Sequence, residues 1–134
     1  MSLMSLDGHR VDVLATAAHR PVLVQFFDTV CVTCQQQQPA LCTLAATLPR
    51  VVVVVVDAGQ ESAAAVSSYA RSYVPQSCAV VPLVDPGAGV SRNYAITVVP
   101  TYYVVDSTGH IAFGGVGAKG LAAAQPVLRQ LAGA

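Results

Sequence analysis

Two cysteines separated by two residues stand where a strand-like run gives way to a helix-like one. Val22–Phe27 is an apolar run with the composition of a buried strand, and a short polar turn follows it. Cys31 and Cys34 then begin a segment whose residue pattern predicts a helix. Residues at this spacing meet at the first helical turn, so the two sulfurs can form a disulfide or bind a metal. At a helix N-terminus, unpaired N–H groups and the positive end of the dipole stabilise a thiolate.

The composition is that of a single domain with a core of its own. The chain has 134 residues, of which 54% are hydrophobic and 10% charged, and its formal net charge is zero. This balance argues against a nucleic-acid surface and against a long disordered segment. The longest purely apolar run, Val51–Val56, is far shorter than the roughly 20 residues that a membrane span needs. We therefore expect neither nucleic-acid binding nor membrane insertion by this chain.

The first residues carry a short repeat and no secretory leader. Met1-Ser2-Leu3 is followed by Met4-Ser5-Leu6, and no basic stretch precedes an apolar one. We interpret residues 1–5 as an added or disordered start of the single domain 1–134. The compartment stays open: extracytoplasmic, periplasmic or membrane-tethered, if a leader was trimmed, and cytoplasmic otherwise.

The order of the elements predicts an α/β domain. Strand patterns alternate with helix patterns, and a hairpin around Asp106–Gly109 precedes the last helix. This order favours a parallel sheet core with helices on both faces and antiparallel strands at one side. The expected strands are 22–27, 51–57, 80–84, 102–105 and 110–113, and the expected helices are 31–48, 61–73, 89–94 and 118–131.

Further landmarks accompany the cysteines. Pro39 lies five residues after Cys34, where it should kink the helix, and Val99-Pro100-Thr101 forms a loop before a strand. Leu6-Asp7-Gly8 lies upstream, and Tyr94-Ala95-Ile96 and the hairpin residues Asp106–Ile111 lie downstream. A CxxC motif in a βαβ setting is typical of thioredoxin-like redox proteins. With these landmarks, residues from about 6 to 131 resemble the TlpA/ResA-like thiol–disulfide oxidoreductases of the thioredoxin-fold superfamily.

The resemblance implies a thioredoxin-like fold, with a central mixed sheet, a TlpA-like N-terminal extension and an insertion between residues 61 and 85. It implies an enzyme that exchanges disulfides with protein substrates, expected to act as a reductant. Cys31, at the turn, is the expected nucleophile, and Cys34 is the expected resolving thiol. The resemblance predicts that the Val99–Pro100 bond is cis and that Val99, Pro100 and Thr101 contact the substrate. It implies no metal and no cofactor beyond the redox-active disulfide, and an electron-donor protein as a second partner.

The chain departs from that family around the motif. Phe27 and Val30 stand where tryptophans are usual, and Gln25 and Gln37 stand where the related proteins have carboxylates. An amide cannot accept the proton of the resolving thiol. We therefore expect water to act as the base, resolution by Cys34 to be slow, and a Gln37→Glu substitution to speed turnover. Val32 and Thr33 carry no charge, so they give no direction for the reduction potential.

Other readings of the cysteines remain. A metal site needs more ligands, and Cys42 lies two helical turns beyond Cys34, too far along the axis to share one. Two buried unreactive thiols are a further alternative. Peroxide reduction requires Thr three residues before the reactive cysteine, where this chain has Asp28. The rival function is a redox-slow or inactive binding module of the same fold. Cys42 and Cys78 are expected to be buried thiols, although a disulfide between them stays open because it depends on distance.

Overall fold

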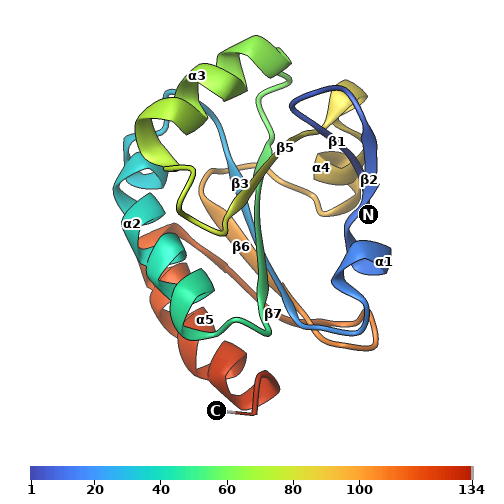
Figure 1. The fold of residues 1–134 in the computed structure, drawn as a ribbon, viewed down its shortest axis with the longest axis vertical. Helices are drawn as coiled ribbons and strands as arrows, with labels where there is room; N and C mark the ends of the chain where they lie inside the picture. The colour runs from blue at the N-terminus through green and yellow to red at the C-terminus, as the bar shows by residue number, and fades with distance from the viewer. Residues whose placement is uncertain (134) are drawn as a thin grey trace.

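A seven-stranded mixed sheet forms the centre of the molecule, in the order β2-β1-β5-β4-β3-β6-β7 (Figure 1). The computed structural model describes residues 1–133. Strands β3, β4 and β5 run parallel, whereas β1, β2, β6 and β7 pair antiparallel with their neighbours. The strands are β1 Ser2–Ser5, β2 Arg10–Asp12, β3 Val22–Phe27, β4 Val52–Asp57, β5 Val81–Val84, β6 Thr101–Val105 and β7 Ile111–Val116. The helices are α1 Val13–Ala17, α2 Val32–Thr47, α3 Ala63–Tyr73, the 3₁₀ turn η1 Pro86–Ala88, α4 Gly89–Asn93 and α5 Gly117–Leu131.

Helices cover both faces of this sheet, which confirms the expected fold class. Alternation along β3 sends Leu23 and Phe27 to a core shared with α2, α3 and α5. Val24 and Phe26 go to the opposite core, which α1 and α4 cover (Figure 1). The buried valines of β4 divide between the two cores in the same way. A strand buried on both faces reads as a continuous apolar run, as this one does.

The first residues belong to the sheet. Ser2–Ser5 form β1, which lies between β2 and β5, and Leu3 is buried in the core under α1 and α4. The expectation of a disordered start is therefore wrong. These residues are ordered because β1 pairs with the edge of β5 and satisfies backbone groups that this edge would otherwise leave unpaired. β1 and β2 occupy the expected N-terminal extension, and α3 and β5 occupy the segment assigned to the insertion.

Strand β7 is longer than the sequence indicated. Gly114 and Gly115, which lie beyond the expected strand 110–113, pair with β6. A Cβ atom at Gly120 of α5 would lie 2.7 Å from the carbonyl carbon of Gly115. Helix α5 thus approaches β7 closely because neither residue has a side chain at the crossing. Both α2 and α5 continue through their internal prolines, Pro39 and Pro126.

Candidate active site

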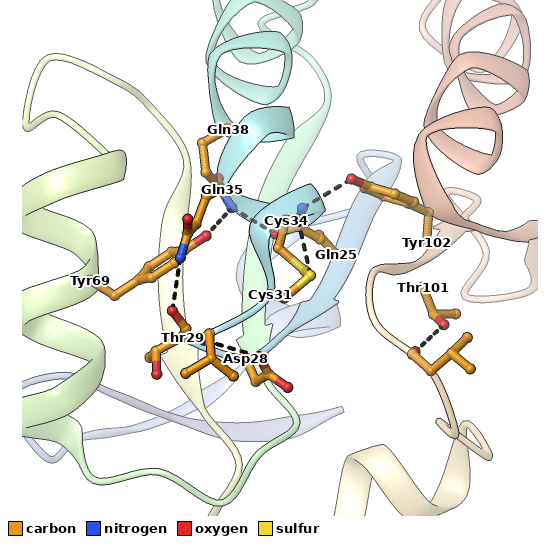
Figure 2. The surroundings of a disulfide bond; sticks show 12 residues. Gln25, Asp28, Thr29, Cys31, Cys34, Gln35, Gln38, Tyr69, Thr101 and Tyr102 are labelled. Carbon is orange, nitrogen blue, oxygen red and sulfur yellow. Dashed lines mark hydrogen bonds between the residues drawn. A yellow bond between two sulfur atoms is a disulfide. The ribbon is translucent and has the colours of Figure 1, made fainter.

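The CxxC motif lies where the end of β3 meets the start of α2. Cys31 is the N-cap residue of α2, with extended backbone angles, and its Sγ accepts the N–H of Cys34 at 3.0 Å. The two cysteines form a disulfide with their Cα atoms 5.2 Å apart (Figure 2). Cys31 is half-buried, whereas Cys34 is 0% exposed. Of the two cysteines, only Cys31 has surface exposed to solvent.

A chain of buried polar side chains lies beneath the disulfide. Gln25 of β3 donates through Nε2 to the hydroxyl of Tyr102 at 3.0 Å. Gln38 of α2 donates to Oε1 of Gln25 at 2.8 Å and to the hydroxyl of Tyr69 at 3.0 Å (Figure 2). Gln25 and Gln38 are 0% exposed. Among the described residues no group hydrogen-bonds Oε1 of Gln38, so this amide network is left with one unsatisfied acceptor.

This network contains no group that ionises near neutral pH. Burial raises the pKa of Tyr69 to about 12, and burial likewise raises the pKa of Tyr102 to about 12. Both phenols therefore stay neutral. Gln37, which stands where the related proteins have a carboxylate, is half-buried and lies outside the network, whereas Gln38 hydrogen-bonds Gln25. The physical reason is helical geometry, because a residue four positions after Cys34 lies closer to its stripe than a residue three positions after it.

The loop before β6 lies beside the end of β3. The Val99–Pro100 peptide bond is cis. Thr101 pairs with Phe26 of β3, and its hydroxyl donates to the carbonyl of Val98 at 2.7 Å. Figure 2 shows Thr101 and Tyr102 on one side of the disulfide and Thr29 and Tyr69 on the other. The three residues expected to contact substrate thus follow one another next to the strand that carries the motif.

The remaining residues that we expected to support the motif are placed as follows. Phe27 is buried and stacks on Tyr69, with ring centroids 4.7 Å apart. Val32 is 61% exposed, and Thr33 is half-buried at the first turn of α2. Pro39 is exposed within α2. Phe27 is therefore a core residue directly before the loop that leads to Cys31, whereas Val32 forms part of the surface next to Cys31.

Acidic side chains hold the loop between β3 and Cys31, which we call the redox loop (residues 28–31). The Thr29 N–H donates to Oε1 of Glu61 at 3.0 Å, and the Thr29 hydroxyl donates to Oε2. The Val30 N–H donates to the Asp28 carboxylate at 3.1 Å. Sequence reasoning missed Glu61, and only its place after a strand that neighbours β3 could have indicated it. Sequence reasoning also missed Gln38, although it lies four residues after Cys34 and a spacing of four places both residues on the same face of a helix.

Cys42 and Cys78 form a second disulfide, with Cα atoms 5.3 Å apart. Our expectation of two plain buried thiols is therefore wrong, and both residues are half-buried. Cys42 lies in the middle of α2, and Cys78 lies in the turn after α3, where its N–H donates to the carbonyl of Pro75. The packing of that turn against α2 brings two cysteines 36 residues apart together, and spacing in the sequence carries no sign of this contact.

The described residues hold neither a cluster of metal ligands nor a helix long and apolar enough to cross a membrane. Within residues 1–133, no three His, Cys, Asp or Glu side chains are gathered so that they could hold a metal ion. In the same part of the chain, each helix is too short or too polar to cross a membrane. The redox-active cysteines are the chemically reactive groups that the site presents.

Comparisons with known proteins agree with this geometry. The Redoxin family model matches residues 1–128. Mycobacterium tuberculosis DsbF, solved in mixed oxidized and reduced forms, is 25% identical, and the match covers 98% of this chain and 92% of that chain with a TM-score of 0.78. No curated protein gave a match.

Two further solved structures share the fold at lower identity. A secreted M. tuberculosis disulfide oxidoreductase homologous to E. coli DsbE is 20% identical, over 84% of this chain and 80% of that chain, with a TM-score of 0.70. The exposed lipoprotein thioredoxin Etrx1 of Streptococcus pneumoniae is 22% identical, over 98% of both chains, with a TM-score of 0.81. With a CxxC disulfide at a helix start and a Redoxin match over nearly its whole length, the chain belongs to the Redoxin family and is a thiol–disulfide oxidoreductase of the thioredoxin fold, related to the TlpA/ResA-like proteins.

Proposed function

We propose that this enzyme reduces disulfides in protein substrates, with Cys31 as the nucleophile and Cys34 as the resolving thiol. One observation carries the proposal: the half-buried Cys31 is joined to the fully buried Cys34 at the start of α2. The Cys31 thiolate attacks a substrate disulfide, which forms a mixed disulfide and releases one substrate thiol. Cys34 then attacks Sγ of Cys31, so that the second substrate thiol leaves and two electrons have passed to the substrate. An electron-donor protein with a dithiol restores the reduced enzyme.

The direction of electron flow is supported by the charges at the redox loop. The charged side chains that hydrogen-bond the loop are those of Asp28 and Glu61, and both are acidic. A nearby anion disfavours a thiolate, and a less stable thiolate makes the disulfide form the more stable one. A couple that prefers its disulfide form gives electrons to its partners. The enzyme is therefore expected to act as a reductant.

The substrate is expected to bind across the surface that surrounds Cys31. Val30 and Val32, the chain neighbours of Cys31, are 80% and 61% exposed. On the side of the cis-proline loop, Val98 is 51% exposed, and Val99, Pro100 and Thr101 follow it. These side chains all lack an ionisable group, although Thr101 carries a hydroxyl, and the burial of apolar surface lowers the free energy of binding. We expect an extended substrate segment with apolar residues next to its cysteine.

An extracytoplasmic location is supported by the second disulfide. Disulfides persist in oxidising compartments and are rare in the cytosol. Cys42 and Cys78 are joined by a disulfide that lies away from the CxxC motif, on the middle of α2. Trapping cellular thiols with a maleimide reagent tests this point. A protein recovered from cells with Cys42 and Cys78 reduced would contradict the location.

The test of the proposed function is an equilibrium titration of the Cys31–Cys34 couple against glutathione, combined with reduction of insulin disulfides. We expect a couple more reducing than glutathione and insulin reduction that disappears in Cys31→Ser. The rival function, a binding module of this fold, predicts a disulfide that does not cycle although the protein is folded. A couple that cycles but is more oxidising than glutathione would overturn the reductant direction while leaving the exchange activity in place.

A further inference from the structure

The redox loop is fixed from outside by a carboxylate that comes from the segment between β4 and α3. Glu61 accepts two hydrogen bonds from Thr29, one from its N–H at 3.0 Å and one from its hydroxyl. Thr29 lies two residues before Cys31. A carboxylate that accepts two bonds from one residue fixes both its position and its orientation. No other side chain of the described residues forms a hydrogen bond to the N–H of Thr29.

Glu61 is itself held by the end of a core strand. Asp57 ends β4, where it pairs with Phe27, the last residue of β3. Its two carboxylate oxygens accept the N–H of Gly59 at 2.9 Å and the N–H of Glu61 at 2.7 Å. A Cβ atom at Gly59 would lie 3.1 Å from Oε1 of Glu61 and 3.2 Å from Cβ of Asp28. The redox loop and the loop after β4 are therefore in close contact at Gly59.

The other side of the redox loop is held by α2. Nε2 of Gln35 donates to the carbonyl of Thr29 at 3.0 Å, and the Gln35 N–H donates to the carbonyl of Cys31 at 3.1 Å (Figure 2). Thr29 thus makes hydrogen bonds through its N–H, its hydroxyl and its carbonyl. These bonds hold the backbone through which Cys31 enters the helix, and in this arrangement Sγ of Cys31 accepts the Cys34 N–H. The same N–H would stabilise a thiolate at Cys31 after reduction.

We propose that Glu61 is a positioning residue for the nucleophile: by holding Thr29, it keeps Cys31 at the helix N-terminus, where its thiolate is stabilised. This inference rests on the proposed role of Cys31. Burial opposes ionisation of Glu61, but hydrogen bonds from the Thr29 hydroxyl, from Asp57 and from the Thr29 N–H outweigh it and lower the pKa of Glu61. The acceptor is thus ionised in the range where the enzyme would work.

Glu61 has two effects on the Cys31 thiolate, and they have opposite signs. Its position favours the thiolate through the helix N-terminus, whereas its negative charge disfavours the thiolate. Glu61→Gln removes the charge but keeps an acceptor for the Thr29 N–H, and its amide can donate to the Thr29 hydroxyl oxygen. Glu61→Ala removes both the charge and the hydrogen bonds. The two variants therefore separate positioning from charge.

The experiment measures the rate at which iodoacetamide alkylates Cys31 in the reduced protein at about pH 6, with the modified peptide identified by mass spectrometry. At a pH below the thiol pKa this rate follows the thiolate fraction. We expect Glu61→Ala to react at least about threefold more slowly than Glu61→Gln, which corresponds to a thiol pKa about half a unit higher. Thr29→Val should react more slowly than Thr29→Ser, because serine keeps the hydroxyl that Glu61 accepts.

A control variant keeps a merely structural effect apart. The Ser62 side chain caps α3 by accepting the N–H of Ala65 and forms no hydrogen bond with residues 28–31. Ser62→Ala should weaken the segment that carries Glu61 and leave the alkylation rate of Cys31 unchanged. Equal rates in Glu61→Ala and Glu61→Gln would overturn the proposal, as would a faster rate in Glu61→Ala. Alkylation needs no partner protein, so failure of insulin reduction would count against the proposed function alone.

Discussion

Replacing Gln38 by Glu puts an ionisable group into the buried amide network beneath the disulfide. The new carboxyl group has nearly the shape of the amide. In its protonated form, the O–H that replaces Nε2 can donate to Oε1 of Gln25, in place of the present 2.8 Å bond, and the same oxygen can accept from the Tyr69 hydroxyl. The protonated variant therefore keeps both hydrogen bonds of the network, and its other oxygen is unpaired as Oε1 of Gln38 is in the wild type. The ionised variant loses the bond to Gln25.

The magnitude follows from the burial of the site. A fully buried carboxyl has its pKa raised by up to about 3–5 units from roughly 4.3. With a folded pKa near 7, the ionised group costs the folded protein about 3 kcal/mol at neutral pH relative to pH 4. The sign is that of a raised pKa: the variant loses stability as pH rises from about 4 to 7, because the unfolded chain releases its proton first. A base with a pKa near the working pH typically speeds a proton transfer by about 10²–10⁴-fold.

The assay isolates the resolving step. Reduced protein is converted to a mixed disulfide between Cys31 and thionitrobenzoate, and the coloured thiol that Cys34 releases is followed as a function of pH. We expect Gln38→Glu to speed this step by at least about tenfold near pH 7 and to add an inflection there. Gln37→Glu, the substitution that the sequence alone suggested, is the matched control, because Gln37 lies outside the network. A Gln38→Glu profile that superposes on the wild type, or the same inflection in Gln37→Glu, would refute the reasoning.

Three further predictions concern stability. Replacing both Cys42 and Cys78 by Ser should lower the free energy of unfolding by about 4 kcal/mol in urea denaturation, since the bridge closes a loop of 36 residues; a loss below about 1 kcal/mol would contradict this. Burial, with a hydrogen bond to Glu61, raises the pKa of Asp57 to about 6, so the wild type should lose at most about 3 kcal/mol as pH rises from 4 to 6, and Asp57→Asn should flatten this slope. An unchanged slope would show that another group titrates. Gly120→Ala should cost about 1–3 kcal/mol in thermal unfolding, because its Cβ would meet the Gly115 backbone at 2.7 Å, whereas Gly89→Ala, with open space around it, should cost far less.

The sequence was sufficient for the fold because its strongest patterns are local. The β3 and β4 runs are continuous and apolar, and the CxxC motif marks the junction of β3 and α2, so the sheet core could be predicted from them. Strand β1 was missed because its short sequence, Ser2–Ser5, has one fully buried side chain, Leu3, and gives almost no pattern. The last residues of β7 were missed because Gly114 and Gly115 disfavour strands locally, and tertiary packing against α5 decides their conformation.

The part of the site that is formed by residues close together in the sequence could be predicted from the sequence alone. Cys31 and Cys34 were evident, and the cis-proline loop followed from a resemblance that spans the chain. Glu61 was not evident, because it reaches Thr29 across 32 positions, and a carboxylate before a helix is an ordinary surface residue in sequence. The second disulfide was missed for the same reason. Contacts between segments far apart in the chain depend on the packing of whole elements, which local patterns do not encode.

The positions of the amides and carboxylates together indicate which of the two cysteines has ionisable groups near it. Beneath Cys34 the side chains are neutral, since Gln25 and Gln38 are amides and both tyrosines keep their protons. The ionisable groups lie instead beside the redox loop, at Glu61 and Asp57. A charge there acts on the exposed nucleophile, whereas a base beneath Cys34 would act on the resolving thiol. Changes at Glu61 should therefore alter the attack on substrate with little effect on release of the mixed disulfide, and changes at Gln38 should do the reverse.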